Sequence, residues 1–346
     1  MSSVFSPRYT ITERLLTNIK QINILVENLN HRNFPKVVQF EFEKTAREVS
    51  SFASTSIEGN PLPLTEVKKI LKSTPHHLRD SEREVINYNQ VLADLNDKIK
   101  KEGVSLSIPL ILTIQKGVTS GLLPKQESGH FRKSPVVVND PRTGKIVFIP
   151  PDETDIKALM GDLLNYISKK RKATDHLILA GIFHKQMVLI HPFSDGNGRT
   201  ARLATKVLLA EMGLNTFNLF SFENYYNRNV SRYFQMVGEQ GDYYELERKV
   251  NFTPWLEYFT EGIIDELLRV QKILLPAAAA QNQLTSYQQK ILDFVKVHGS
   301  IRDRDYAKLV KRAKPTRALD FRKLVKLGIL TRKRKGPATY YIQKER

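Results

Sequence analysis

The chain has 346 residues, 41% of them apolar, and is long enough for roughly two or three domains with their own cores. It contains no cysteine, which excludes disulfides, thiol nucleophiles and cysteine-ligated zinc. No apolar run reaches the ~18 residues of a membrane span, and the first residues lack the basic and apolar regions of a secretory signal. We therefore expect no membrane association and a cytoplasmic location.

The net charge of +18 is concentrated at one end of the chain. Residues 283–346 contain 18 Lys and Arg against 5 Asp and Glu, a net charge of +13. The preceding residues contain 36 basic and 31 acidic residues, a net charge of only +5. This contrast indicates two regions with different chemistry.

Apolar residues recur with helical spacing through most of the chain, beginning with Leu15, Ile19, Ile22 and Leu25. A second helix is expected over 36–58; Pro61 and Pro63 follow it, and Thr65 is the expected N-cap of the next helix. Further helical patterns cover about 81–100, 107–119, 153–170, 174–189, 198–212, 225–238 and 253–275. Pro276, an alanine run and the polar residues 281–283 then indicate a domain boundary.

One stretch in the middle of the chain is typical of strands. Residues 136–138 and 146–149 are rich in Val and Ile, and they flank a turn-forming loop that contains Asn139, Asp140 and Gly144. This pattern predicts a β-hairpin. A hairpin in a helical protein can cover a core edge, or it can form a flap that offers a strand edge to an extended peptide. The residues alone favour the first interpretation.

The segment from His191 to Arg202 contains the strongest chemical signal. Asp195 follows His191 by four residues, and a Gly-Asn-Gly turn at 196–198 then opens a helix that bears Arg199 and Arg202. Amides at such a turn and helix N-terminus bind anions, and both arginines lie on one helical face. A carboxylate beside phosphates is a natural Mg²⁺ ligand, and a histidine is the commonest general base at neutral pH. The set indicates a nucleoside triphosphate, a metal ion and a proton acceptor.

This segment, HPFSDGNGRTAR, resembles the Fic signature H-x-F-x-[D/E]-G-N-G-R-x-x-R at all eight specified positions. The resemblance covers roughly 1–275, most strongly 105–260. It implies a helical core in which this loop joins two helices and a β-hairpin flap covers the site. It thereby favours the flap interpretation of the hairpin at 136–149. The implied fold class is mainly α.

The resemblance also implies an activity, the transfer of AMP from ATP to a Ser, Thr or Tyr hydroxyl of a protein. His191 takes the hydroxyl proton, Asp195 holds Mg²⁺, and Phe193 anchors the loop. Phosphate oxygens are bound by Gly196, Asn197, Gly198, Arg199 and Arg202. Tyr233, with Tyr225 and Asn227, falls where the family recognises the base, although core packing is an equally good interpretation of these aromatic residues.

A second motif lies far upstream. Ser54 and Glu58, followed by Gly59, resemble the family's inhibitory pattern [S/T]-x-x-x-E-[G/N] at the end of a predicted helix. The resemblance implies that Glu58 pairs with Arg202 where the γ-phosphate would bind, and that Ser54 holds the inhibitory helix. The alternative is an ordinary helix C-terminus with Glu58 in solvent and Gly59 as the residue after the cap.

The basic C-terminal segment has three helical patterns, over 287–297, 303–310 and 315–327, followed by a β-rich basic stretch. This order resembles a winged helix-turn-helix domain. Thr316, Arg317, Arg322 and Lys323 would lie on the recognition helix, and 332–336 would form the wing. The charge suits a phosphate backbone, but winged helices also mediate protein contacts and dimerisation.

We therefore predict an N-terminal helical region with the inhibitory helix at 1–100, a Fic catalytic core at 101–275 and a winged helix at 283–346. The predicted protein is an ATP- and Mg²⁺-dependent protein adenylyltransferase, repressed by Glu58, that can modify itself and forms a homodimer. One alternative is another reaction on the same site, either AMP removal or use of another nucleotide. Another is a DNA-binding regulator whose Fic core senses nucleotide.

Overall fold

The structure is a computed structural model that describes residues 5–31, 36–140, 143–211, 221–281, 284–326, 329–334 and 336–344. It is mainly helical, as predicted. The described residues divide into two compact units, one drawn from Met1–Arg32 and Glu43–Val270 and the other from Asn33–Phe42 and Gln271–Arg346. We call them the catalytic unit and the C-terminal unit. None of the described helices combines the length and apolar character of a membrane span.

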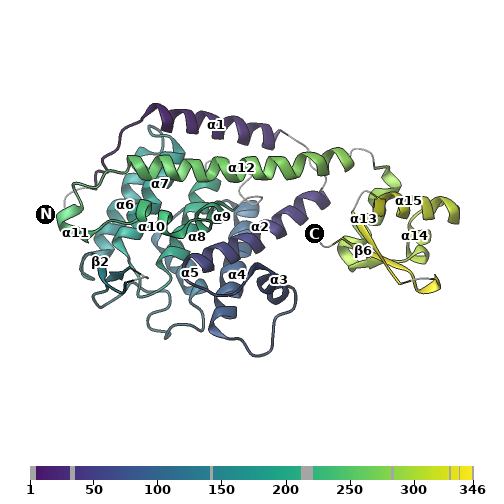
Figure 1. Ribbon diagram of the computed structural model, residues 1–346, viewed down its shortest axis with the longest axis horizontal. Helices are drawn as coiled ribbons and strands as arrows, with labels where there is room; N and C mark the ends of the chain where they lie inside the picture. Colours follow the sequence, from purple (N-terminus) through teal and green to yellow (C-terminus); the bar gives the residue numbers. More distant parts are fainter. Residues whose placement is uncertain are drawn as a thin grey trace. The chain divides into compact units, whose positions relative to one another are not determined.

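The helices up to residue 281 follow the predicted order (Figure 1). They are α1 (Glu13–Asn30), α2 (Lys36–Ile57), α3 (Leu64–Lys72), α4 (Asp80–Glu102), α5 (Ile108–Val118), α6 (Ile156–Lys170), α7 (His176–Ile190), α8 (Asn197–Glu211), α9 (Phe222–Asn227), α10 (Val230–Val237), α11 (Tyr243–Leu246) and α12 (Thr253–Gln281).

Three boundaries differ from the prediction. Helix α3 begins at Leu64 after Pro63, so Thr65 is in its first turn and is not its N-cap. The pattern at 225–238 is two helices, because the side chain of Asn229 accepts a hydrogen bond from the Arg232 amide and caps α10. Helix α12 continues beyond Pro276 to Gln281. A proline removes one helical hydrogen bond, and the alanine run after it has the highest helix propensity.

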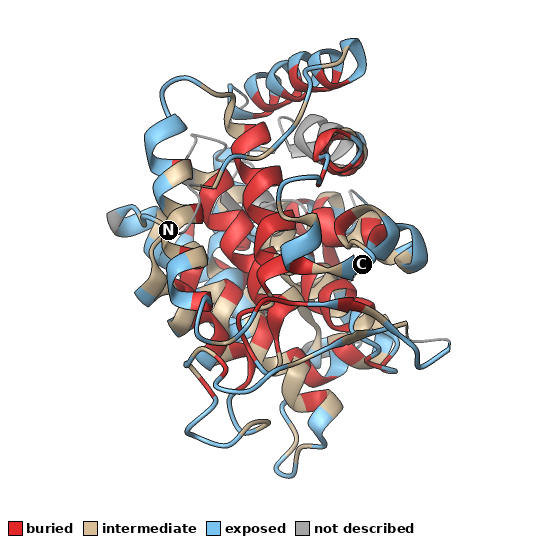
Figure 2. Ribbon diagram, turned by 90° about the vertical axis from the view of Figure 1, so that its left-hand side faces the viewer, coloured by how far each residue is buried: buried red, intermediate tan, exposed pale blue. Residues whose placement is uncertain are grey.

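Figure 2 shows buried residues gathered in the central helices, and helix α7 is buried along most of its length. All but two of its 15 residues are buried, since it is apolar on every side and packs against α6, α8 and α10. Helix α8 in turn packs against α4 and α5. A fully buried helix has little freedom to shift. The loop between α7 and α8 is therefore held at both ends by the core.

The predicted hairpin is present but short. Strand β1 (Val138–Asn139) pairs antiparallel with β2 (Ile146–Ile149), with Val138 opposite Phe148. Phe148 is buried, while Ile146 and Ile149 are exposed. Strand β3 (Gly241–Asp242) pairs in parallel with β2, which the sequence did not indicate because two residues carry no alternation pattern. Residues 141–142 of the predicted turn lie outside the described residues.

The C-terminal unit contains the predicted helices as α13 (Ser286–His298), α14 (Asp303–Leu309) and α15 (Lys314–Lys326). Strand β6 (Tyr340–Gln343) lies between β4 (Ser300–Ile301) and β5 (Leu330–Lys333), antiparallel to both. The core of the C-terminal unit consists of Ile291, Leu292, Val295, Ile301, Tyr306, Val310, Phe321, Leu324 and Leu330. Residues 282–283 of the predicted boundary and residue 335 of the predicted wing lie outside the described residues.

Candidate active site

The loop between α7 and α8 contains the predicted catalytic segment. His191 caps the C-terminus of α7 in the left-handed conformation, with φ of 48°. Asn197, the first residue of α8, locks the loop in both directions: its Oδ1 accepts from the Phe193 amide at 2.9 Å and its Nδ2 donates to the Phe193 carbonyl at 2.8 Å. The Phe193 ring is buried beside Phe131, which agrees with the anchoring role predicted for it.

The surroundings of His191 leave one of its ring nitrogens free. Its Nδ1 lies 3.3 Å from the Val188 carbonyl oxygen, which can only accept, so Nδ1 carries the proton and Nε2 has the free lone pair. Burial lowers the pKa of His191 below its ordinary value of 6.5. The ring is therefore neutral at pH 7, the form that a general base requires.

Arg132 holds the histidine loop, and the sequence did not single it out. Its Nε donates to the His191 carbonyl at 2.9 Å, and its amide donates to the Pro192 carbonyl at 3.0 Å. The two terminal nitrogens of its guanidinium donate to the carbonyls of Ser134 and Pro151, on either side of the hairpin. Arg132 thus joins the flap to the base. An isolated arginine in a loop gives no sequence signal for such a role.

The start of α8 has the free amides that an anion site requires. Gly196 is the N-cap, because its carbonyl accepts the first helical hydrogen bond from the Thr200 amide at 2.9 Å. The amides of Asn197, Gly198 and Arg199 are the first of the helix and have no partner within it. Such amides, together with the positive end of the helix dipole, bind phosphate oxygens.

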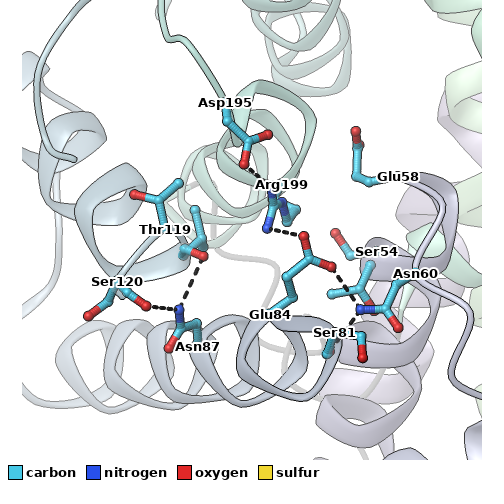
Figure 3. Close-up of polar contacts among 12 residues, drawn as sticks. Ser54, Glu58, Asn60, Ser81, Glu84, Asn87, Thr119, Ser120, Asp195 and Arg199 are labelled. Atoms are coloured by element: carbon cyan, nitrogen blue, oxygen red, sulfur yellow. Dashed lines mark hydrogen bonds and ion pairs between the residues drawn. The ribbon is translucent and has the colours of Figure 1, made fainter. Parts of the chain in front are cut away.

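Arg199 lies between two carboxylates (Figure 3). One terminal nitrogen, Nη2, donates to Asp195 Oδ2 at 2.8 Å, and the other, Nη1, donates to Glu84 Oε1 at 3.1 Å. Gln115 fixes the backbone of Asp195 by donating from Nε2 to its carbonyl at 3.1 Å. Glu84 and Gln115 come from α4 and α5, so only the tertiary structure shows that they belong to the site.

Asp195 fits the predicted metal role. Its side chain is 47% exposed and lies beside the anion site. No group of three or more potential metal ligands occurs within the part of the chain that the structure describes. Mg²⁺ commonly takes one or two carboxylates and completes its shell with substrate phosphates and water, so a single carboxylate here suffices for it.

Arg202 is fully buried and already paired with Glu58. Its Nη2 donates to Glu58 Oε1 at 2.7 Å and to the Ser54 carbonyl at 2.9 Å, and its Nε donates to Ser54 Oγ at 2.8 Å. Burial alone would lower the pKa of Arg202. The electrostatic contributions of Glu58, Tyr233 and Tyr88, together with the hydrogen bond to Glu58, outweigh burial and raise the pKa above its ordinary value. The contacts implied for Glu58 and Ser54 are both present.

The end of α2 aims Glu58 at this arginine. The amide of Asn60 donates to the Thr55 carbonyl and that of Gly59 to the Ser56 carbonyl, the pattern of a Schellman cap. Gly59 has φ of +93°, which a glycine adopts without strain. Gly198 makes room, because a Cβ there would lie 2.1 Å from Glu58 Oε1. Gly59 follows the helix cap, as the alternative interpretation required, but the carboxylate of the partly exposed Glu58 is paired with Arg202.

Tyr233 lies behind Arg202 in the core. It is 1% exposed, its ring stacks on Tyr226 at 4.9 Å, and its hydroxyl lies 3.0 Å from His184 Nε2 and 3.4 Å from Arg202 Nη1. Of the two interpretations given for this residue, the burial favours packing over base recognition. Tyr225 is only partly buried and contacts Tyr258.

Comparison with known proteins agrees with this geometry. Residues 105–209 match the Fic/DOC family, so this segment of the chain carries a Fic domain. It is 27% identical over 217 residues to the protein adenylyltransferase Fic of Aedes aegypti, covering 57% of this chain and 42% of that protein. It is 32% identical over 167 residues to the protein adenylyltransferase fic-1 of Caenorhabditis briggsae, covering 47% and 31%. The chain thus spans less than half the length of these relatives.

A solved structure has a similar fold. A crystal structure of a Fic family protein from Desulfovibrio desulfuricans G20 superposes with a TM-score of 0.68 over 99% of both chains, at 19% identity. At this identity the likeness shows the fold alone.

Proposed function

We propose that this Fic protein transfers AMP from ATP to a Ser, Thr or Tyr hydroxyl of a protein, itself included, and that Glu58 represses the transfer. One observation carries the proposal: a neutral histidine with a free Nε2 lies in the same rigid loop as free helix amides and two arginines. The relatives named as protein adenylyltransferases support the same reaction.

Each group of this segment has its own role in the proposed reaction. Nε2 of His191 accepts the hydroxyl proton as the oxygen attacks the α-phosphorus. The bond from that phosphorus to the bridging oxygen breaks, and pyrophosphate leaves. The amides of residues 197–199 hold phosphate oxygens, and Arg199 neutralises the charge at the β/γ end. A Mg²⁺ held by Asp195 would neutralise further charge on the α- and β-phosphates.

Glu58 opposes this reaction through Arg202. Its carboxylate pairs with the Arg202 guanidinium, which would otherwise hold the γ-phosphate. The carboxylate and the γ-phosphate would repel each other if both bound this buried cation. ATP must therefore displace Glu58 or bind with its phosphates misplaced. A partly buried pair of this kind can bias an equilibrium by a few kcal/mol, on the order of a tenfold to hundredfold change in activity.

The test uses purified wild type, Glu58→Gly and Glu58→Gly/His191→Ala with α-³²P-ATP and Mg²⁺, and measures self-labelling. We expect strong labelling of Glu58→Gly, weak labelling of wild type and none of the double variant. Equal labelling of wild type and Glu58→Gly would reject the inhibition. Labelling that survives His191→Ala would reject the base. AMP release from a modified protein, without transfer, would favour the reverse reaction on the same site.

A second proposed function concerns the C-terminal unit. The order of α13, β4, α14, α15, β5 and β6 supports a winged helix, and Arg322 and the hairpin residues Arg332, Lys333 and Arg334 are exposed. This favours a phosphate backbone as the partner. Arg317, which we expected to share that role, is held within the unit by two hydrogen bonds to Asp303. DNA binding should therefore be tested with Arg322→Gln. In that variant the DNA affinity should fall less steeply as the salt concentration is raised.

A further inference from the structure

A second carboxylate links the inhibitory turn to the other motif arginine. Glu84, on α4, accepts from Arg199 Nη1 through Oε1 at 3.1 Å and from Asn60 Nδ2 through Oε2 at 2.7 Å. Figure 3 shows its side chain lying between these two partners. Both oxygens are therefore used, one on each side. The reaction proposed above assigns no role to this residue.

Asn60 is the fixed point of the inhibitory turn. It is 8% exposed, and its side chain makes three contacts: Nδ2 donates to Glu84 and to the Ser81 carbonyl at 2.8 Å, and Oδ1 accepts from the Leu62 amide at 3.1 Å. Its own amide closes the Schellman cap of α2 on Thr55 at 3.1 Å. Glu58 lies two residues earlier. The place of Glu58 therefore depends on where Asn60 is held.

The electrostatics of this turn require such a hold. Glu58 follows the last residue of α2, at the negative end of the helix dipole, where a carboxylate is disfavoured. Its compensation is Arg202, which it can reach only while the turn stays against α4 and α8. The contact from Asn60 to the ionised Glu84 is charge-assisted and is one of the stronger hydrogen bonds available to the turn.

We propose that Glu84 is a positioning residue that holds the inhibitory turn through Asn60 and Arg199 through the same carboxylate. The two arginines of the motif are thereby restrained together: Arg202 by Glu58, and Arg199 by the carboxylate that also holds Glu58 in place. Loss of either contact of Glu84 loosens the inhibitory turn. This role in inhibition rests on the proposed function, but the link itself is a property of the fold.

Glu84→Gln and Asn60→Ala test the link. A glutamine has one acceptor oxygen, so in either orientation its NH₂ group faces a donor, either Arg199 or Asn60. Asn60→Ala removes the contact to the turn and leaves Arg199 untouched. Asn87→Ala is the matched control, because Asn87 lies one turn further along α4 and donates to the Ser120 carbonyl at 2.8 Å instead.

Two measurements are made on the full chain. The first is hydrogen exchange of the peptide that spans residues 55–62, whose protected amides include those of Gly59 and Asn60. Glu84→Gln and Asn60→Ala should each speed this exchange about tenfold, the factor that corresponds to about 1.4 kcal/mol. Asn87→Ala should leave it unchanged.

The second measurement is self-labelling from α-³²P-ATP, in the wild-type and the Glu58→Gly backgrounds. Both variants should raise the labelling of the wild type about tenfold. Asn60→Ala should leave the labelling of Glu58→Gly unchanged, because in that background the turn has no carboxylate left to release. A residue that only stabilises the fold would lower the labelling in both backgrounds.

The outcomes separate this inference from the proposed function. If Glu58→Gly labels, and Glu84→Gln changes its labelling as much as that of wild type, Glu84 acts on Arg199 alone and the link is wrong. If no variant labels, the proposed reaction fails, and exchange alone decides the link. Faster exchange in both variants then supports it, and unchanged exchange in either one overturns it.

Discussion

Helices α8 and α15 each have an arginine that the sequence predicted to meet an external anion, and in each case a carboxylate of the chain already holds it. Arg202, which is fully buried, pairs with the partly exposed Glu58, 144 positions away. Arg317 pairs with Asp303, only 14 positions away, through two hydrogen bonds in the C-terminal unit. Glu58 directly follows the last residue of α2 and lies against Gly198, whereas Asp303 is the first residue of α14.

The two ion pairs differ in their surroundings. In the proposed function, Glu58 blocks a site whose other residues, His191 and the first amides of α8, remain available to a substrate. Asp303 joins two neighbouring helices, α14 and α15, of the C-terminal unit. An arginine in an anion-binding motif is thus a candidate for regulation when its partner comes from a distant segment, and for structure when its partner is local.

The largest expected effect separates the two arginines by stability. Arg202→Leu leaves Glu58 and the Ser54 carbonyl without their buried partner, so we expect a loss of about 3–5 kcal/mol in the free energy of unfolding. Arg317→Leu should not change the unfolding of the catalytic unit at all. Trp255, the only tryptophan, lies buried in that unit, and its fluorescence in a urea titration reports on it selectively. Equal shifts of the tryptophan transition in both variants would contradict the comparison.

The next effect depends on pH and concerns the support behind Arg202. Burial, followed by the charge of Arg202, lowers the pKa of His184 from 6.5 to about 3. Because the unfolded chain binds this proton first, stability is complete above pH 6.5 and falls as the pH drops toward 3, by up to about 1.4 kcal/mol per pH unit.

Urea unfolding at pH 7 and pH 5 measures this slope, with an expected loss of about 2 kcal/mol from His184. His184→Gln is the control: it cannot be protonated, so the difference between the two pH values should shrink by that amount. An unchanged slope would mean that His184 titrates normally.

An effect of similar size concerns Gly198. In Gly198→Ala the new methyl group must displace Glu58 from Arg202, and the lost charged hydrogen bond should cost about 1.5–3 kcal/mol. In the Glu58→Gly background the same substitution should be neutral or stabilising, since alanine favours a helix over glycine by about 1 kcal/mol. Thermal unfolding of wild type, Gly198→Ala, Glu58→Gly and the double variant completes a double-mutant cycle. Additive effects would show that Gly198 does not make room for Glu58.

The smallest expected effect on stability is at the exposed surface of α15. Arg322→Gln should leave the unfolding of the C-terminal unit unchanged, unlike Arg317→Leu, which should weaken it. If that unit binds DNA, Arg322→Gln should reduce the slope of log affinity against log salt by about 1. Circular dichroism and fluorescence anisotropy with a labelled duplex provide the two readouts. The reverse pattern, with Arg322 needed for folding, would remove the distinction drawn here.

The sequence by itself determined the helices, the two regions and the chemistry of the loop. The signature from His191 to Arg202 is contiguous, so one short segment carries the base, the turn and both arginines. Helical periodicity and turn residues are equally local, and they predicted most elements to within a few residues. They failed at Thr65, because α3 begins directly after Pro63 with no side-chain cap, and at Asn229, where one side-chain hydrogen bond caps a separate helix.

Only the tertiary structure decided which groups face these residues. Arg132, Gln115 and Glu84 fix the loop from three other elements, and no spacing in the sequence relates them to it. Whether Arg202 and Arg317 are open to a ligand depended on Glu58 and Asp303, and whether Tyr233 faces a nucleotide depended on the packing around it. Motifs record the local backbone and its chemistry, whereas burial and ion pairing arise when distant segments exclude water together.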